Sequence, residues 1–418
     1  MRRPFFLMTL VLLVLAVFVV PVSAQDATTL ELYLVGLPQD GIDWFNNEAF
    51  PAFEAANPGV DIELINGDWG TFDASVAGWI TTGDGPDIVY LGSEYAAEYG
   101  SLLADLDPYL ADWEDLDQFL PAAIDTVTYD GSLRGLPLLM SARPYYYRTD
   151  LVANPDAELP MTFADSLAFV QENTIVEDNA LQQMGFRDID GLGFDAQEFI
   201  AYIWSAGGEL YNEDGTSAFD SPETAEALQF MHDRRRAMMP DETTAGLPPA
   251  EGYPISSGLG ISGIFPMWNM PPVDDAAWEN IAIAPYPAGE GGEPLVQVFI
   301  DWLAVPAYVE DPALAAEFLK FIGSKENATA MSEVIGFTPV RVDAWEELRA
   351  NSPVWDQVLT LTEEYGRGFS DIRASAELRP LLVEQVMLYL SDQQSLEETQ
   401  SNLKEEYDAI LEDQGFIE

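Results

Sequence analysis

The N-terminal third of the chain alternates between short apolar runs and amphipathic stretches. Apolar runs over residues 30–36, 60–65 and 87–91 have strand length, and each of them leads into a glycine. Between these runs, apolar residues at helical spacing predict helices over 43–56 and 72–81. This β-α-β-α-β order predicts parallel strands joined by crossover helices, and therefore an α/β lobe. Ligands of such lobes bind at the loops that follow the carboxyl ends of the strands.

The later part of the chain predicts more helix. Ser221-Pro222 is typical of a helix start, because the serine side chain can cap free backbone N–H groups and proline fits the first helical turn. Asp311-Pro312 predicts a second helix start, and Asp130-Gly131 favours a hairpin turn. A long loop is expected over 246–263, where proline and glycine are frequent.

Residues 1–24 are typical of a secretory signal peptide. Arg2 and Arg3 precede an apolar run over 5–20, and small residues lead up to Ala24. We expect cleavage after Ala24 and a periplasmic or extracellular protein. The chain contains no cysteine, so a lipid-modified N-terminal cysteine is excluded.

Charge and residue inventory narrow the classes of function. The 418 residues carry 17 basic and 72 acidic side chains, a net charge of −55, which repels phosphate backbones and excludes nucleic-acid binding. The absence of cysteine and the presence of one histidine exclude disulfides, thiolate metal sites and centres that need two histidines. We therefore expect no metal and no cofactor. The acidic surface either keeps a monomer soluble or is an adaptation to a salty medium, where repulsion is screened.

Seven short phrases follow one another along most of the chain. They are residues 50–59 (FPAFEAANPG), 83–88 (GDGPDI), 130–137 (DGSLRGLP), 146–151 (YYRTDL), 204–208 (WSAGG), 315–322 (AAEFLKFI) and 338–341 (TPVR). In this order they resemble extracellular solute-binding protein family 1, the maltose-binding-protein-like receptors of carbohydrate ABC transporters.

The resemblance implies an α/β fold of the two-lobed periplasmic-binding-protein type (type II), with a ligand cleft between lobes joined by crossover hinge segments. Chain crossings are expected near residues 138–143, 281–284 and 339–341. The implied lobes are an N-lobe of 25–140 plus 282–340 and a C-lobe of 141–281 plus 341–418.

The function implied by the resemblance is carbohydrate capture. The expected ligand is a neutral mono- or oligosaccharide, and the expected partners are the permease subunits of an ABC importer, with no catalysis. Two alternatives stay open. One is a secreted glycoside hydrolase or lyase, because carboxylates are abundant. The other is a receptor for a non-sugar solute, such as a polyamine, which an acidic surface would suit.

A sugar is held by aromatic faces and by planar polar groups that bond its hydroxyls. In the N-lobe, polar and aromatic residues that follow the three predicted strands are the candidates, and solvated turns are the alternative. They are Gln39, Asp40, Asp68, Trp69, Glu94 and Tyr95.

Further candidates come from the positions where the family carries ligand contacts. Ser141 stands where the family commonly has an acidic sugar contact, and Arg143 could substitute for it as a donor. Asp195 could equally cap the helix that follows it. The additional candidates are Gln197, Gly263, Phe265, Trp268, Asp301, Trp302, Arg341 and Arg379. His232, beside acidic and basic neighbours, is interpreted as an ion-paired surface residue.

Overall fold

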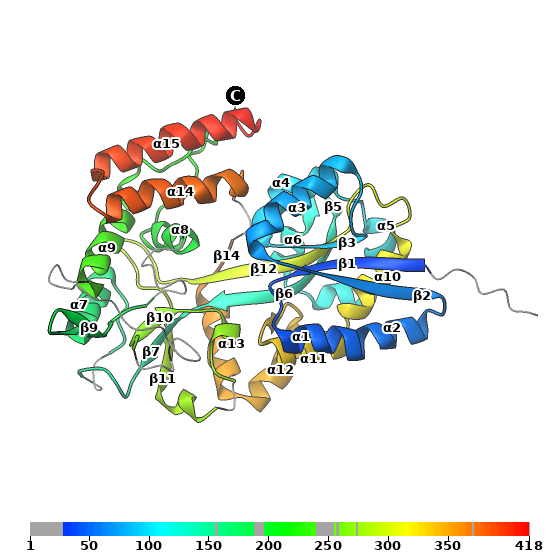
Figure 1. Cartoon of the computed structure of the whole chain (residues 1–418), viewed down its shortest axis with the longest axis horizontal. Helices are drawn as coiled ribbons and strands as arrows, with labels where there is room; N and C mark the ends of the chain where they lie inside the picture. Colours follow the sequence, from blue (N-terminus) through cyan, green and yellow to red (C-terminus); the bar gives the residue numbers. More distant parts are fainter. Residues whose placement is uncertain are drawn as a thin grey trace, which may run out of the picture.

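The computed structural model describes residues 28–154, 158–187, 196–239, 255, 259–272, 275–369 and 372–417, without the side chains of Ala97 and Trp268. These residues form two lobes that lie side by side (Figure 1). The predicted signal peptide and most of the predicted 246–263 loop lie outside the described residues. No helix in the described part of the chain is long and apolar enough to span a membrane.

The N-lobe is built on one mixed sheet. β1 (Thr28–Val35) pairs in parallel with β2 (Val60–Gly67) and β3 (Ile88–Leu91), which confirms the predicted parallel strands. β12 (Val296–Ala304) pairs antiparallel with β3 and with β6 (Gly135–Arg143). The sheet order is β13-β6-β12-β3-β1-β2, with β13 (Thr338–Pro339) at the edge and β14 (Gly366–Gly368) beside β12.

Helices flank this sheet, and two of them begin earlier than the sequence predicts. The predicted 43–56 helix is a continuous run of α1 (Gln39–Trp44), the π-helix η1 (Phe45–Ala49) and α2 (Phe50–Ala56). α3 (Trp69–Thr82) begins at once after Asp68, whose carboxylate accepts from the backbone N–H of Gly70 at 2.8 Å. The other helices are α4 (Ala96–Tyr99), α5 (Asp107–Leu110), α6 (Pro121–Thr126), α10 (Ala313–Ile322), α11 (Lys325–Ile335), α12 (Val342–Asn351) and α13 (Pro353–Tyr365).

Short elements complete the N-lobe. The predicted hairpin turn is confirmed: β4 (Thr128–Tyr129) and β5 (Ser132–Leu133) pair antiparallel, and Asp130 and Gly131 both have positive φ. The single-turn 3-10 helices in the described residues of the chain are η2 (Ser93–Tyr95), η3 (Gly100–Leu102), η4 (Glu114–Gln118), η5 (Met267–Asn269) and η6 (Ala276–Asn280).

In the part of the chain that the structure describes, the C-lobe combines small antiparallel sheets with five helices. One sheet has the order β10-β7-β11, and β8 and β9 form a separate two-stranded antiparallel sheet. The bounds are β7 (Tyr145–Arg148), β8 (Ile175–Glu177), β9 (Ala180–Gln183), β10 (Ser262–Ile264), β11 (Ile281–Ala284), α7 (Phe163–Asn173), α8 (Ala196–Ser205), α9 (Pro222–Met238), α14 (Ser375–Leu390) and α15 (Leu396–Asp413). The hydroxyl of Ser221 accepts from the N–H of Thr224, which confirms the predicted start of α9.

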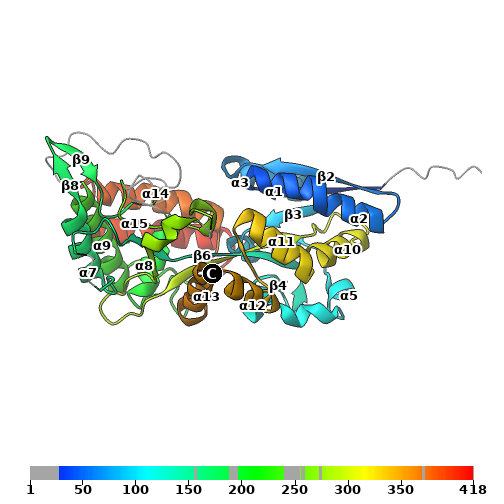
Figure 2. The same cartoon turned by 90° about the horizontal axis from the view of Figure 1, so that it is seen from below.

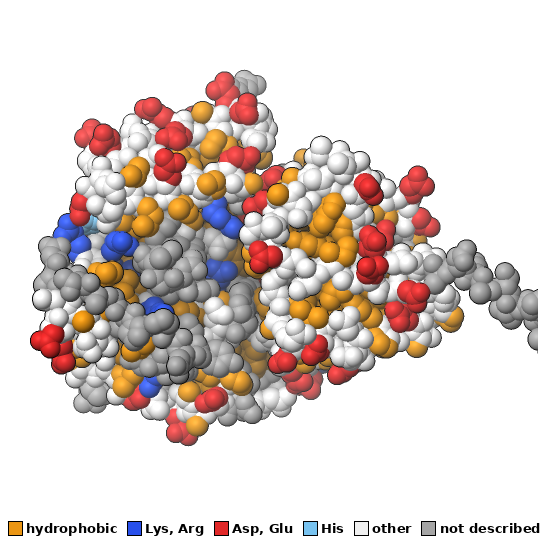
Figure 3. Space-filling view, in the orientation of Figure 1, with side chains coloured by type: hydrophobic (Ala, Val, Ile, Leu, Met, Phe, Trp, Pro, Cys, Tyr) orange, Lys and Arg blue, Asp and Glu red, His pale blue; other side chains and the backbone are white. Residues whose placement is uncertain are grey.

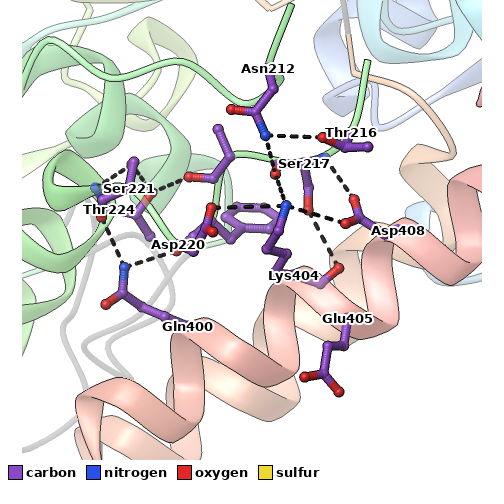
Figure 4. Close-up of polar contacts among 12 residues, drawn as sticks. Asn212, Thr216, Ser217, Asp220, Ser221, Thr224, Gln400, Lys404, Glu405 and Asp408 are labelled. Atoms are coloured by element: carbon purple, nitrogen blue, oxygen red, sulfur yellow. Dashed lines mark hydrogen bonds and ion pairs between the residues drawn. The ribbon is translucent and has the colours of Figure 1, made fainter. Parts of the chain in front are cut away.

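The C-terminal helix α15 is fixed to the loop that precedes α9 (Figure 4). The Lys404 ammonium donates to the carbonyl oxygen of Ser217 at 2.7 Å, and the N–H of Ser217 donates to Asp408 at 2.7 Å. The Gln400 amide donates to the carbonyl oxygens of Phe219 and Ser221, both at 2.9 Å. These bonds tie the end of the chain to a segment almost 200 residues earlier.

A fully buried ion pair lies inside the C-lobe. The guanidinium of Arg234 on α9 donates to Glu198 on α8 at 2.7 Å and also to the hydroxyls of Tyr145 and Tyr202. The guanidinium carbon (Cζ) of Arg234 lies 4.0 Å from the ring centroid of Phe186. The neighbouring His232 has the acidic partner that was predicted, since its Nε2 lies 2.9 Å from Asp392, but its side chain is 13% exposed and therefore not fully on the surface.

Two hydrophobic clusters divide the chain at points other than the predicted lobe boundaries. Residues 342–365 were expected in the C-lobe, but Trp345, Leu348 and Trp355 pack into the N-lobe cluster. Tyr286 and Leu295, which were expected in the N-lobe, pack into the C-lobe cluster. The chain returns to the N-lobe within β12 and leaves it near β14. Figure 2 shows β6 passing between the lobes, with α13 close to it.

Candidate functional site

A cavity of about 710 Å³ opens between the β1–α1 loop of the N-lobe and the η5 segment of the intervening chain. Its volume is within the range of small-molecule sites. Most of the lining side chains are apolar, and the polar ones are Asp40, Asn269, Ser332, Glu333, Asn351 and Ser352. The apolar ones include Leu37, Pro38, Met267, Met270, Pro271, Pro272, Ile335, Leu348 and Trp355.

Trp69 packs next to Gly36, which is one of the residues that line this cavity. Its indole packs on Gly36, where a side chain would collide with it, and 46% of the residue stays exposed. The ring also lies 5.2 Å from Phe72 and 6.2 Å from Tyr90. A half-exposed aromatic face held by two other rings provides a stacking surface for an apolar sugar face.

The predicted residues on α1 and at the start of α3 have different surroundings. Asp40 is exposed and lines the cavity. The Gln39 amide donates to Asp43 at 2.8 Å on the helix surface. Asp68 caps α3, which is the solvated-turn alternative considered from the sequence.

Two carboxyl groups are buried together at the end of β3 and in the middle of β12. The strand pairing Leu91↔Trp302 brings Asp301 close to Glu94, and the charge of Glu94 acts on Asp301. Burial, reinforced by Glu94, raises the pKa of Asp301 to about 7, although the Tyr90 hydroxyl donates to it. Burial likewise raises the pKa of Glu94, and the nearby Arg379 and Arg143 oppose that rise.

Basic groups of the C-lobe side face these carboxyls. Arg379 on α14 donates to Glu94 at 3.3 Å. Arg143, at the end of β6, donates to the Gln197 amide oxygen at 2.9 Å, and its guanidinium lies 4.1 Å from the Phe299 ring centroid. The site therefore presents hydrogen-bond acceptors from the N-lobe and donors from the C-lobe.

A second, smaller recess adjoins Arg379 and Gln197. Its wall is mainly apolar and lies between α8 and α14. The remaining lining residues are Ala196, Ile200, Phe369, Ile372, Ser375, Leu378 and Leu382.

Several predicted contacts lie in the protein interior. Phe265 is 1% exposed and packs in the N-lobe cluster, and Trp302 is equally buried, with its indole donating to the Gly92 carbonyl. Arg341 is buried between Asp115 and Asp343, which it bonds at 2.9 and 2.8 Å. A ligand cannot reach these three side chains while the lobes hold this arrangement.

The remaining predicted residues are scaffold positions or are not described. The Tyr95 hydroxyl donates to Asp73 at 2.5 Å, and Ser141 is a buried hydroxyl on β6 without a partner among the described residues. Gly263 lies against the backbone of Arg187, where a Cβ would collide. Asp195 and the side chain of Trp268 lie outside the described part of the chain.

Three residues of the site were missed from the sequence: Tyr90, Asn269 and Trp355. Trp355 follows Ser352-Pro353, a helix-start signal whose serine hydroxyl accepts from the N–H of Val354. That signal could have located Trp355 at a helix start, but not beside the β1–α1 loop. Among the described residues, no group of three or more histidine, aspartate or glutamate side chains is placed to hold a metal ion.

Comparison with known proteins identifies the family to which the chain belongs. Residues 38–329 match the family described as bacterial extracellular solute-binding protein. A putative binding protein of Brucella abortus is 29% identical over 194 residues, which are 44% of each chain. An arabinooligosaccharide-binding protein of Bacillus subtilis is 27% identical over 61% of this chain and 59% of its own length. The chain thus aligns with roughly half the length of these relatives.

Solved structures agree on the fold. Maltose-bound MalE3 of T. maritima superposes with a TM-score of 0.76 and 20% identity, covering 92% of this chain and all of that one. The protein CpMnBP1 with mannotriose bound superposes with a TM-score of 0.75 and 17% identity, covering 91% of this chain and 99% of that one. The two-lobed α/β periplasmic-binding-protein fold expected from the sequence is thereby confirmed.

Proposed function

Since the chain belongs to the bacterial extracellular solute-binding proteins, we propose that it captures a carbohydrate outside the cytoplasm and delivers it to the permease subunits of an ABC importer. The observation that carries this proposal is the cavity between the β1–α1 loop and η5. The names of relatives and of solved neighbours, which include arabinooligosaccharide, maltose and mannotriose, support a sugar as the ligand.

The lining of the site suits a neutral sugar. Pyranose rings have apolar faces, which Trp69 and the apolar cavity wall would cover, and a rim of hydroxyls that donate and accept hydrogen bonds. Asp40 and Glu94 are acceptors, whereas Arg143 and Arg379 are donors. A ligand of two or more sugar units would extend from the cavity towards the carboxyl pair.

Binding without turnover is the corresponding proposal for the chemistry. Glycoside hydrolysis needs two carboxyl groups on opposite sides of the scissile bond. Glu94 and Asp301 instead lie together on one wall, at the end of β3 and on β12. Incubation with arabino-, malto- and manno-oligosaccharides is therefore expected to give stoichiometric binding and no new reducing ends, whereas turnover would favour the hydrolase alternative.

Asp40→Ala tests the cavity as the binding site. We expect the substitution to weaken binding about tenfold, because it removes a charged hydrogen-bond acceptor from the wall. Isothermal titration calorimetry with the best sugar of the panel measures the change. Glu48→Ala, an equally exposed carboxylate further along the same helical run, is the matched control and should leave affinity unchanged. Equal affinities for both variants would remove this cavity from the proposal.

A further inference from the structure

Charged side chains of opposite sign meet where the two lobes face each other. Glu94 belongs to η2 of the N-lobe and Arg379 to α14 of the C-lobe, 285 residues further along the chain. Arg379 Nη2 lies 3.3 Å from Glu94 Oε1, so this ion pair bridges the lobes. In Figure 3 the Lys and Arg side chains visible on this face lie on the left-hand lobe, some of them at its border with the other lobe.

The two residues of this ion pair differ in their exposure to solvent. The Glu94 side chain is 6% exposed and that of Arg379 is 42% exposed. Glu94 is therefore a desolvated carboxylate, and the negative charge of Asp73 further disfavours its ionised form. A buried charge that loses its partner is strongly unfavourable, so Glu94 favours the arrangement in which Arg379 reaches it. Arg143 also acts on Glu94 electrostatically, as the second cation of the C-lobe side.

We propose that Arg379 and Glu94 form an electrostatic latch that holds the two lobes at this separation and thereby strengthens ligand binding. The second half of this statement rests on the proposed function, and the first half does not. The latch makes Arg379 a positioning residue, which acts on the cleft through the lobes rather than only through a contact with the ligand. Because Arg379 is partly exposed, dissolved ions should weaken the latch.

The latch is tested without any sugar, by small-angle scattering from the mature protein at low salt. Arg379→Gln should increase the radius of gyration, because the lobes separate when the carboxylate regains access to water. Arg379→Lys, which keeps the charge, should restore the wild-type value. The matched control is Arg349→Gln, which loses the same charge from a pair with Asp356 and Glu363 near the α12–α13 turn.

Salt distinguishes the latch from a change in folding. In 1 M NaCl, where the Debye length is about 3 Å, the Arg379→Gln and wild-type radii should converge. Glu94→Gln should weaken the latch less than Arg379→Gln, because it leaves no buried unpaired charge, and the double variant should resemble Glu94→Gln. Equal radii for wild type and Arg379→Gln at low salt would overturn the latch, as would a difference that persists unchanged in 1 M NaCl.

A ligand measurement separates this proposal from the function. We expect Arg379→Gln to raise the dissociation constant of a bound sugar about fivefold and Arg349→Gln to leave it unchanged. If the radii behave as expected but no sugar binds, the latch stands and the proposed function fails. If sugars bind and the radii are equal, the function stands and the latch fails.

Discussion

Asp301 and Glu94 are carboxyl groups that strand pairing brings into one desolvated place. Both were predicted as site residues, Glu94 because it follows an apolar strand and Asp301 because the resembled family carries a loop at its position. The sequence could not predict that Glu94 acts on Asp301, since the antiparallel pairing of β12 with β3 joins segments some 200 residues apart. The same limit explains Phe265 and Trp302: their aromatic type is compatible with a ligand contact or with a core, and only packing decides.

Asp301 should make stability depend on pH. The pKa of Asp301 is about 7 in the folded protein, above the usual unfolded value near 4. The contribution of Asp301 to the free energy of unfolding is therefore greatest below pH 4 and is lost as pH rises through 7. The Asp301→Asn variant cannot ionise at this position and should not lose this stability as pH rises. Urea unfolding from pH 4 to pH 8 should show the wild type losing on the order of 2–4 kcal/mol relative to the variant.

The control for this titration is Asp112→Asn, an exposed aspartate in the same lobe. The free energy of unfolding of the Asp112→Asn variant, relative to the wild type, should stay nearly constant over the same pH range. A constant difference for Asp301→Asn as well would contradict the raised pKa. The groups that face Asp301 and set its titration are Glu94, Tyr90 and Arg143.

At the scale of elements, helix starts show what local sequence signals can and cannot give. Ser221-Pro222 was predicted correctly because the cap is a local hydrogen bond. α1 begins at Gln39, after a proline that provides no side-chain cap, so nothing local marked that start. The consequence reaches the site, because Asp40 lies in the first turn of a helix, where a carboxylate is favoured by the helix dipole.

The C-terminal helix α15 begins with a capping box. The Ser395 hydroxyl accepts from the N–H of Glu398, and the Glu398 carboxylate accepts from the N–H of Ser395. Ser395→Ala should lower the free energy of unfolding by about 1 kcal/mol, measured by urea denaturation. Ser401→Ala, at an exposed position inside the same helix, should leave stability unchanged or raise it slightly. Equal losses at both positions would assign the effect to the hydroxyl rather than to the cap.

At the scale of the molecule, the resemblance predicted the two-lobed fold, but the lobe boundaries depend on packing. α12 and α13 join the N-lobe because Trp345, Leu348 and Trp355 fit its core, which spacing along the chain does not reveal. Charge belongs to this scale too, since 72 acidic residues against 17 basic ones cover both lobes with repelling groups.

Salt should therefore stabilise the whole protein. Between 0.05 and 1 M NaCl the Debye length falls to about 3 Å, which removes most repulsion between exposed carboxylates. We expect the midpoint of thermal unfolding to rise steadily over this range. Sucrose at equal osmolality controls for exclusion of solute from the surface. A midpoint that responds equally to sucrose and to NaCl would mean that self-repulsion has little influence on folding.

The path of β12 has a consequence for how the protein unfolds. Phe299, in the middle of this strand, packs into the C-lobe cluster, whereas its neighbours Val298 and Ile300 pack into the N-lobe cluster. The partner strand β6 runs alongside β12 for its whole length. We therefore expect the two lobes to unfold in one cooperative step, because melting either cluster would remove packing partners from a strand that both clusters share. An excised lobe would lack part of its own core.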